Sequence, residues 1–464
     1  MFGRLLWPAL LWIVLAAFSV PASADELPTI TGPITSQAIG SAERDYPFFA
    51  SNQPLATHGY VEEEFFVEGR TRRHTSRYPA RTFEGGQFQG DDVPFKTRIV
   101  VRRPVDRGRS NRVVVVEWNN VSNRFDADNV WLSSWAHLVR SGYTWVGVTA
   151  QGYGGAETLS SWNPRRYGSL HIPNDGRMAW EPYALGIFDQ VGRLLRSPAG
   201  ARILGDGSNR TLVAAGQSQS AMWLATYING GLGRDGPYDG YLLLSAMGMP
   251  VRPDTPAPVL RIVPEGDLLR AREAALTPSD TPRYRQWEIA GASHVDRYLR
   301  SNREPTELRD LGTSVQAALA PTCTIPSIGT STPAHLVIAA GLDHLVAWSR
   351  GGAAPPVAPR MTRERSPEGP RLARDANGSG LGGIRLPNLD APTSLEVGAN
   401  SGPEGCEGQG YSIRFSVEEL RARYRSPADR LRRLRRSAMR AARDGFIPKY
   451  ARSELVATAR DDAW

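Results

Sequence analysis

The apolar positions of the chain alternate between short unbroken runs and longer stretches with helical spacing. Arg112–Trp118 contains four consecutive valines, which is typical of a strand buried on both faces. Val130–Arg140 has large apolar residues on one face and predicts a helix that ends near Gly142. Tyr143–Ala150 predicts the next strand. This order of strand, helix and strand indicates a parallel α/β sheet.

The same criteria predict further elements on both sides of this unit. Gly59–Gly69 and Phe95–Arg103 are β-rich and partly alternating, so they favour an antiparallel opening pair with 70–92 as a loop between them. Further strands are predicted at 211–215, 238–245, 258–263 and 285–290, and helices at 183–196, 332–349 and 418–444.

One stretch joins a predicted strand directly to a predicted helix. The apolar run that begins at Thr211 ends at Gly216, and residues Ala221–Ile228 then have helical spacing. Between them stands Gly-Gln-Ser-Gln-Ser, with Ser218 at its centre and small residues on both flanks. A strand that turns directly into a helix exposes its central side chain over the sheet edge. The pattern indicates a nucleophile elbow, and the simpler alternative is a serine in an ordinary loop.

A catalytic serine needs an adjacent base that a third group orients. Three histidines follow Ser218 in the chain, and two of them, His335 and His344, fall within a predicted helix. His294 instead follows a predicted strand, where its side chain can project over the sheet edge. We therefore expect His294 to be the base, and the alternative is a surface histidine or one whose hydrogen bonds are satisfied within the fold.

The acid of such a triad lies between the serine and the histidine in the chain. The strand predicted at 258–263 is followed by Glu265 and Asp267. Asp267 stands at the usual loop position and is the predicted acid, whereas Glu265 takes the role if the loop turns one residue earlier. The distance to the imidazole decides between them, and the other carboxylate is then a solvated loop residue or a supporting hydrogen-bond acceptor.

An oxyanion hole needs two N–H groups directed at the developing charge. The first is expected from Gln219, the residue after the nucleophile, and the second from the loop after an early strand. In that loop Asn120 is favoured and Asn119 is the alternative. The triplet that begins at Asn120 is also a glycosylation sequon, but a glycan there would block the site.

No metal or cofactor is expected from the sequence. The histidines are scattered, and the chain has neither an H-E-x-x-H motif nor closely spaced cysteines. The glycine-rich segment at 152–155 lacks the Lys-Ser/Thr of a phosphate-binding loop. Cys323 and Cys406 are the two cysteines, and in an oxidising compartment they are a candidate disulfide. The alternative is two free thiols.

The N-terminus has the features of a secretory signal peptide. Arg4 precedes an apolar run and an A-x-A site that ends at Ala24, so 1–24 is predicted to be cleaved. The run is short for a membrane span of about 20 residues, and no stable span is expected after processing. The protein is therefore predicted to be exported to the periplasm or the extracellular space.

The remainder, 25–464, is predicted to be one domain with insertions. Segment 151–180 lacks periodicity and is a predicted lid or pocket loop, and 351–464 is a predicted C-terminal extension packed on the core. The net charge is +8, but no compact basic-aromatic module indicates nucleic-acid binding. The basic helix at 418–444 could bind a membrane surface, although a solvated face is the commoner interpretation.

Several stretches of the chain resemble the bacterial α/β-hydrolase-domain proteins that have a G-[EQ]-S-Q-S elbow. The resemblance runs from about Tyr60 to near the C-terminus, so it covers nearly all of the mature chain. One departure is Gln217, where many relatives have glutamate. The matching stretches are Val114-Val-Val-Glu-Trp-Asn-Asn-Val-Ser122, Tyr143-Thr-Trp-Val-Gly-Val-Thr-Ala-Gln151, Arg166-Tyr-Gly-Ser-Leu170, Gly216-Gln-Ser-Gln-Ser-Ala221, Gly291-Ala-Ser-His-Val-Asp296 and Gly382-Gly-Ile-Arg-Leu-Pro387.

The resemblance implies an α/β-hydrolase fold, with a mostly parallel central sheet, helices on both faces and a lid. It also implies a serine-hydrolase role for Ser218 and His294, and it places 166–175 and 382–387 near the pocket. Tyr167, His171 and Asp175 are therefore expected to line that pocket. Three tryptophans near the predicted lid and elbow suggest an apolar substrate face, or else belong to the core: Trp162, Trp180 and Trp223.

Together these features predict an exported serine hydrolase that acts on a small-molecule ester through an acyl-enzyme. Two alternatives remain open at this stage. An amidase or peptidase would use the same triad, and a binding protein on a hydrolase scaffold would use the pocket without catalysis. The sequence does not define the natural substrate or the oligomeric state.

Overall fold

The computed structural model describes residues 26–35, 44–79, 83, 85–174, 181–205, 210–246, 248–270, 279–367 and 371–461. The predicted signal peptide, 1–24, lies outside the described residues. Within them, no helix is long and apolar enough to cross a membrane.

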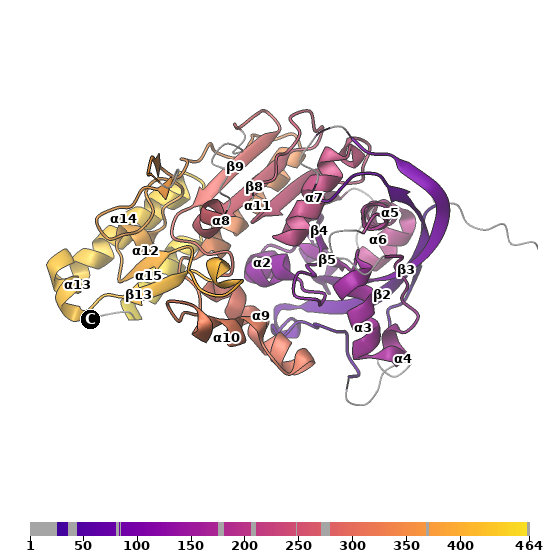
Figure 1. The fold of residues 1–464 in the computed structure, drawn as a ribbon, viewed down its shortest axis with the longest axis horizontal. Helices are drawn as coiled ribbons and strands as arrows, with labels where there is room; N and C mark the ends of the chain where they lie inside the picture. The colour runs from indigo at the N-terminus through magenta and orange to yellow at the C-terminus, as the bar shows by residue number, and fades with distance from the viewer. Residues whose placement is uncertain are drawn as a thin grey trace, which may run out of the picture.

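A nine-stranded sheet forms the centre of the molecule, in the order β1-β2-β3-β5-β4-β6-β7-β8-β9 (Figure 1). The strands from β5 to β9 run parallel, and β1, β2, β3 and β5 pair antiparallel. The predicted α/β-hydrolase fold with a mostly parallel sheet is confirmed. The bounds are β1 (Thr29–Thr31), β2 (Tyr60–His74), β3 (Phe88–Pro104), β4 (Val113–Trp118), β5 (Thr144–Val148), β6 (Thr211–Gln217), β7 (Gly240–Leu244), β8 (Val259–Pro264) and β9 (Tyr284–Ile289).

The loop predicted at 70–92 is shorter in the structure, because strands occupy both of its ends. Strands β2 and β3 pair from Tyr60 and Pro104 out to His74 and Phe88, with one register shift near Thr71. Arginines and glycines dominate this part of the sequence and conceal the strand pattern. Cross-strand pairing, rather than burial of an apolar face, extends the hairpin here.

Helices cover both faces of the sheet. Helices α2 (Asn129–Arg140) and α11 (Ala334–Ser349) pack together on one face, and α5 (Ala184–Arg196), α6 (Pro198–Leu204) and α7 (Gln219–Asn229) cover the other. The remaining helices are α3 (Glu157–Trp162), α4 (Pro164–Tyr167), α8 (Glu265–Arg270), α9 (Arg297–Leu311), α10 (Val315–Leu319), α12 (Pro387–Asp390), α13 (Val417–Arg423), α14 (Pro427–Arg443) and α15 (Ala451–Asp461).

A stack of aromatic side chains fills the core beneath α7. The Trp223 ring lies 5.6 Å from the Trp118 ring and 4.3 Å from the Tyr78 ring, and Trp118 contacts Phe188. Each fully buried side chain of this size contributes roughly 1.5–3 kcal/mol or more to stability. The stack therefore fixes α7 against β4, so that the turn between β6 and α7 has a rigid support.

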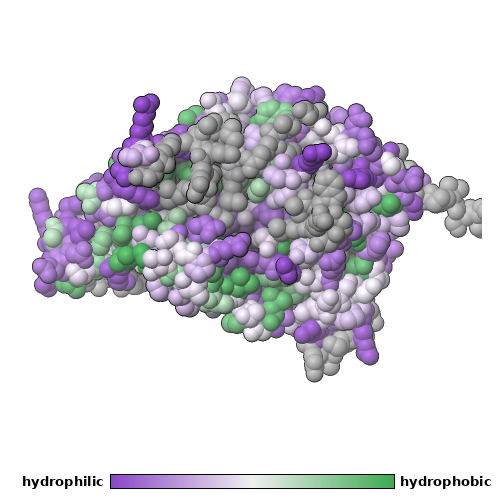
Figure 2. Space-filling view, in the orientation of Figure 1, coloured by the Kyte–Doolittle hydropathy of each residue, from purple (hydrophilic) through white to green (hydrophobic). Residues whose placement is uncertain are grey.

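The C-terminal part, from about 351, packs beyond β9 at the edge of the sheet (Figure 1). The Ile384 amide donates to the Glu288 carbonyl at 2.7 Å, and the Ala290 amide donates to the Ile384 carbonyl at 3.2 Å. The helix predicted at 418–444 is two helices, because Ser426 caps a new helix that begins at Pro427. Hydrophilic side chains gather over α13 and α14 in Figure 2.

Short strands complete this part of the molecule: β10 (Arg363–Glu364) pairs with β11 (Arg371–Leu372), and β12 (Ser394–Val397) pairs with β13 (Tyr411–Arg414).

Candidate active site

Ser218 occupies a strained position between β6 and α7. Its φ of 60° and ψ of −120° lie in a region that non-glycine residues rarely adopt. The strand and the helix approach each other closely here, since a Cβ on Gly216 would lie 2.8 Å from the Ala221 amide nitrogen. Only glycine fits at that position, and the turn has the geometry of a nucleophile elbow.

Hydrogen bonds on both sides hold the turn in place. Ser220 is completely buried, and its hydroxyl donates to the Gln217 carbonyl at 2.9 Å and accepts from the Gln217 amide at 3.1 Å. The Asn120 side chain donates to the same carbonyl at 2.8 Å. Ser220 is therefore a brace of the elbow, whereas Ser218 faces the adjacent cavity.

Asp267 and His294 meet at the carboxyl ends of neighbouring strands. Asp267 lies in the first turn of α8, directly after β8, and His294 lies in the turn after β9. The distance from His294 Nδ1 to Asp267 Oδ1 is 2.7 Å, and the Asp267 side chain is completely buried. A carboxylate on Nδ1 directs the other ring nitrogen, Nε2, away from it and makes that atom available as a base.

Glu265 has a different set of partners. Its carboxylate accepts from the Gly291 amide at 2.7 Å and from the Gly398 amide at 3.3 Å, and it forms an ion pair with Arg374. These bonds join the end of β8 to the C-terminal part of the chain. Of the two carboxylates considered from the sequence, the structure brings only Asp267 to the imidazole.

The two expected oxyanion donors differ in their surroundings. Gln219 is the first residue of α7, and the first N–H groups of a helix have no acceptor within it. The expectation for Asn120 is wrong, because its N–H already donates to the Ala127 carbonyl at 2.7 Å. The alternative, Asn119, donates to the Val148 carbonyl at 3.1 Å.

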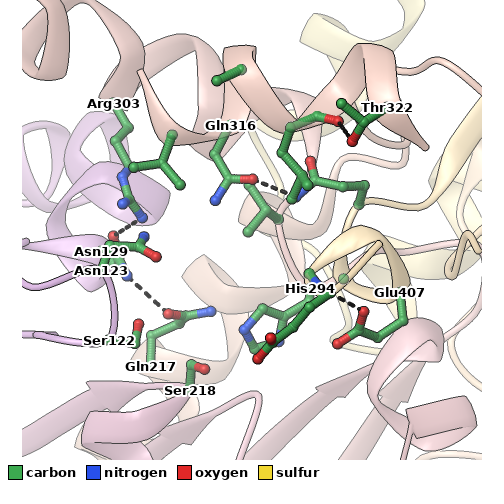
Figure 3. Close-up of a pocket in the computed structure, with 18 of the residues that line it drawn as sticks. Ser122, Asn123, Asn129, Gln217, Ser218, His294, Arg303, Gln316, Thr322 and Glu407 are labelled. Carbon is green, nitrogen blue, oxygen red and sulfur yellow. Dashed lines mark hydrogen bonds between the residues drawn. The ribbon is translucent and has the colours of Figure 1, made fainter. Parts of the chain in front are cut away.

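A cavity of about 770 Å³ opens above Ser218 and His294 (Figure 3). Two segments that are distant in sequence, 313–322 and 404–409, form its outer wall, which we call the roof. The polar residues that line the cavity include Ser122, Asn123, Asn129, Gln217, Arg303, Gln316, Glu407 and Gln409. Ser122 and Asn123 belong to the loop that was expected to supply the second oxyanion donor.

A disulfide joins the two segments of the roof. Cys323 and Cys406 lie 83 residues apart in sequence, with an S–S distance of 2.11 Å and a Cα–Cα distance of 5.5 Å. Cys406 adjoins Glu407 and Gly408, which line the cavity, and Cys323 directly follows Thr322. The covalent link therefore ties the two segments of the roof to each other beside the cavity.

The expected pocket residues that the structure describes do not line this cavity. Tyr167 is completely buried, and its hydroxyl donates to Glu64 at 2.7 Å. Trp223 belongs to the aromatic stack, and His171 is exposed and pairs its backbone with Lys96. Asp175 and Trp180 lie outside the described residues.

The described parts of the two segments expected near the pocket do not line this cavity either. None of the described residues of 151–174 lines the cavity, and neither does segment 382–387, which packs against β9. Trp162 packs its ring 5.2 Å from that of Phe48, so it belongs to the core rather than to a substrate face. Of these described segments, the roof rather than 151–174 borders the cavity above Ser218.

Several cavity residues could not be predicted from the sequence. Asn129 begins α2, and its side chain donates to Gln217 Oε1 at 2.9 Å, while Arg303 Nη1 donates to Asn129 Oδ1 at 3.3 Å. Gln409 donates to Gln316 across the two segments of the roof. The one signal available was the cysteine pair, because a disulfide would bring 313–322 and 404–409 together.

Behind His294 lies a small void of about 40 Å³, which Asp296 also lines. Asp296 caps α9 by accepting from the Leu299 amide at 2.8 Å. Burial raises its pKa from 3.8 to about 6, and hydrogen bonds from the backbone amides of α9 oppose that shift. The described residues contain no group of three His, Cys, Asp or Glu that could hold a metal ion.

The sheet order and the strained strand-to-helix turn at Ser218 are typical of α/β hydrolases. Residues 30–457 match the model of the alpha/beta hydrolase domain family. The chain therefore belongs to the alpha/beta hydrolase domain family.

Comparison with solved structures gives distant matches. An alpha-beta serine hydrolase homologue from Coxiella burnetii is 13% identical, with 47% of this chain and 93% of that chain covered and a TM-score of 0.29. A lidless a/b serine hydrolase from Xanthomonas campestris is 12% identical, with 52% and 93% covered and a TM-score of 0.29. Esterase Est22 is 13% identical, with 57% and 82% covered and a TM-score of 0.32. Similarity this low says nothing about substrate. No curated protein matches the chain.

Proposed function

We propose that this protein is a serine hydrolase that cleaves carboxylic esters through an acyl-enzyme, with Ser218, His294 and Asp267 as its triad. The observation that carries the proposal is the 2.7 Å contact between Asp267 and His294 at the cavity that Ser218 also lines. Buried Asp267 holds the Nδ1–H tautomer of His294, so that Nε2 can accept the proton of Ser218.

In the first half of the reaction, Ser218 Oγ forms a bond to the ester carbonyl carbon as its proton passes to His294 Nε2. The negative charge that develops on the carbonyl oxygen is stabilised by the Gln219 amide at the positive end of α7. The C–O bond to the alcohol then breaks, and the proton on Nε2 moves to the departing oxygen. This step leaves the acyl group on Ser218.

In the second half, a water molecule loses a proton to His294 Nε2 and attacks the acyl carbon. The proton returns to Ser218 Oγ when the acyl–enzyme bond breaks, which releases the carboxylic acid. We assign the second oxyanion donor to the Asn123 amide in the loop after β4, because Asn123 lines the cavity and the amides of Asn119, Asn120 and Ser122 are already bonded.

A fluorophosphonate probe followed by mass-spectrometric site mapping tests the nucleophile. We expect one adduct on Ser218 of the folded protein, and none on the Ser218→Ala variant. Ser220→Ala is the matched control, since that serine is buried in the same turn and should not be labelled. An unlabelled Ser218 in folded protein contradicts the proposal and favours a binding protein.

Rates on matched esters and amides test the reaction class. We expect measurable hydrolysis of short p-nitrophenyl esters and much slower hydrolysis of the corresponding anilides. Faster cleavage of the amide would reassign the protein to the amidases. Loss of ester hydrolysis in Ser218→Ala by a factor on the order of 10⁴ or more is the expected result for a triad.

We also propose that the protein is exported after cleavage behind Ala24. The disulfide between Cys323 and Cys406 supports this proposal, because such bonds persist in oxidising compartments. Mass spectrometry of the N-terminus of protein recovered from the periplasm or medium should give Asp25 as its first residue. A full-length protein retained in the cytoplasm would contradict it.

A further inference from the structure

Arg303 lines the cavity, and one of its guanidinium nitrogens has no hydrogen-bond partner among the described residues. It lies on α9, and its side chain is 4% exposed. Its Nε atom donates to Glu307 Oε1 at 2.7 Å and Nη1 donates to Asn129 Oδ1 at 3.3 Å. Its Nη2 atom has no hydrogen-bond partner among the described residues. A buried donor without a partner is destabilising, and more so when it belongs to a charged group.

The cavity distinguishes this arginine from others with an unpaired nitrogen. Arg300 lies one turn earlier on α9 and also leaves one nitrogen, Nη1, without a partner, but it does not line the cavity. Glu307 does not line the cavity either, so the neutralising carboxylate lies behind the guanidinium. Arg303 therefore brings positive charge to the cavity wall, and its unpartnered Nη2 is a buried donor beside the cavity.

The other wall of the cavity has the opposite charge. Glu404 and Glu407 line it on the roof, and Glu407 and His294 lie on the other side of Ser218 from Arg303 in Figure 3. A negatively charged group would be repelled there and attracted at Arg303. The cavity therefore favours one orientation of an anionic ligand.

The mechanism determines which part of the ester would lie near each wall of the cavity. His294 has to reach the departing alcohol oxygen in order to protonate it, so the alcohol lies on the His294 side. The acyl group then extends towards Asn129 and Arg303. A bidentate or charge-assisted hydrogen bond from a guanidinium is the preferred way to hold a carboxylate.

We propose that Arg303 is a specificity-determining residue that binds a carboxylate at the far end of the acyl group, so that the preferred substrates are monoesters of dicarboxylic acids. This inference rests on the proposed function, since it takes Ser218 and His294 as the reacting pair. It adds the substrate class: short, polar acyl groups with a terminal negative charge.

The test compares pairs of esters that differ only in that charge. Mono-p-nitrophenyl adipate is matched with p-nitrophenyl hexanoate, and the suberate monoester with the octanoate. For the wild-type protein we expect kcat/KM to be roughly tenfold to hundredfold higher for the anionic member of at least one pair, as for a hydrogen bond to a charged group.

The variant Arg303→Gln with Glu307→Gln removes both charges together and leaves no unpaired buried ion. We expect it to lose most of the preference, mainly through a higher KM for the anionic ester. The matched control is Arg300→Gln with Glu304→Gln, an i,i+4 pair on the same helix whose arginine does not line the cavity. The control should retain the wild-type preference.

The outcomes separate the two proposals. If Ser218 is labelled and neutral esters are hydrolysed, but the wild-type protein shows no preference for the anionic esters, the inference about Arg303 is wrong and the proposed function stands. The same follows if the preference survives in the Arg303 and Glu307 variant, with folding checked by circular dichroism. If Ser218 is not labelled, the proposed function itself fails.

Discussion

Two parts of this molecule that contain only short helices, segment 151–174 and the roof, differ in what surrounds their polar groups. Segment 151–174 packs onto the β2–β3 hairpin, where Arg166 Nη2 lies 2.6 Å from Glu64 Oε2 and Tyr167 donates to the same carboxylate. The roof, 313–322 and 404–409, instead directs polar side chains into the cavity above Ser218.

In segment 151–174 the polar side chains pair within the protein, whereas in the roof they line the cavity. In segment 151–174 the charge of Arg166 is paired within the protein, because its guanidinium forms an ion pair with Glu64. The same carboxylate accepts from Tyr167 and pairs with Arg98. In the roof, Gln316 and Gln409 bond to each other and still line the cavity. Segment 151–174 is rich in aromatic residues and the roof has none, so aromatic content did not indicate which of the two lines the cavity beside Ser218.

The largest expected effect tests whether chemistry occurs under the roof at all. Asp267→Asn should lower kcat roughly 10³- to 10⁴-fold, about 4–5.5 kcal/mol in activation free energy, because His294 loses the carboxylate that holds its tautomer. Steady-state kinetics on a p-nitrophenyl ester measure it. Glu265→Gln is the control, and it should act on stability, since Glu265 bonds to Gly291 and Gly398 instead. The reverse result would exchange the roles of the two carboxylates.

The second effect concerns segment 151–174. Arg166→Met breaks a fully buried ion pair with Glu64 and should destabilise the protein by roughly 3–5 kcal/mol. The neighbouring Arg165 is exposed, so Arg165→Met should stay within about 0.5 kcal/mol of the wild type. Urea denaturation measures both. A raised KM with unchanged stability in Arg166→Met would show that this segment contributes to substrate binding. The contrast with the roof would then be wrong.

The disulfide of the roof comes next in size. Cys323→Ser with Cys406→Ser should cost about 2–4 kcal/mol of stability, because the unfolded chain gains freedom over a loop of 83 residues. We also expect a higher KM, since the two segments of the roof are no longer tied together. Thermal unfolding and ester kinetics measure the two effects, and reduction of the wild-type protein should reproduce them. An unchanged KM would mean that the roof does not shape the substrate site.

The fourth prediction concerns how stability depends on pH through Asp296, which caps α9, the helix between His294 and the roof. Its folded pKa of about 6 lies above its ordinary value of 3.8, so the folded state holds a costly buried carboxylate above pH 6. That cost is lost as the pH falls towards 3.8, where both states are protonated. Asp296→Asn keeps a cap for the Leu299 amide and should raise stability on the order of 2 kcal/mol above pH 6.

The gain from Asp296→Asn should shrink to nothing near pH 4, and unfolding midpoints between pH 4 and 8 measure it. A constant difference across this range would assign the effect to packing or capping rather than to charge.

The smallest effect compares single polar residues of the two parts. Gln316→Ala in the roof should raise KM roughly threefold to tenfold, about 1 kcal/mol, because it removes a cavity amide and its bond to Gln409. Glu157→Ala in segment 151–174 removes an exposed bond to Asn174 and should leave KM unchanged. Equal effects of the two variants would remove the kinetic difference between the parts.

Local sequence determined the elements and the elbow. The unbroken valines before Trp118 form β4, and the small residues Gly216 and Ser220 permit the turn at Ser218. Both depend on neighbours in the chain: periodicity sets which faces are buried, and steric limits set which residues fit a tight turn. The order of Ser218, Asp267 and His294 followed from the same local reading of strand ends.

Only the tertiary structure distinguished between candidate site residues that the local sequence fits equally well. Glu265 and Asp267 occupy the same turn of α8, and only their distances to His294 and Gly291 assign them different partners. Likewise, the amide of Asn120 is bonded because Ala127 returns beside it.

The roof and Arg303 depend on contacts between segments far apart in the chain. Segments 313–322 and 404–409 are joined near Ser218 by a disulfide. Glu307 and Asn129 bond two nitrogens of Arg303, and its buried Nη2 has no hydrogen-bond partner among the described residues. Side chains obtain such partners from the packing of the whole domain, which no local pattern of residues contains.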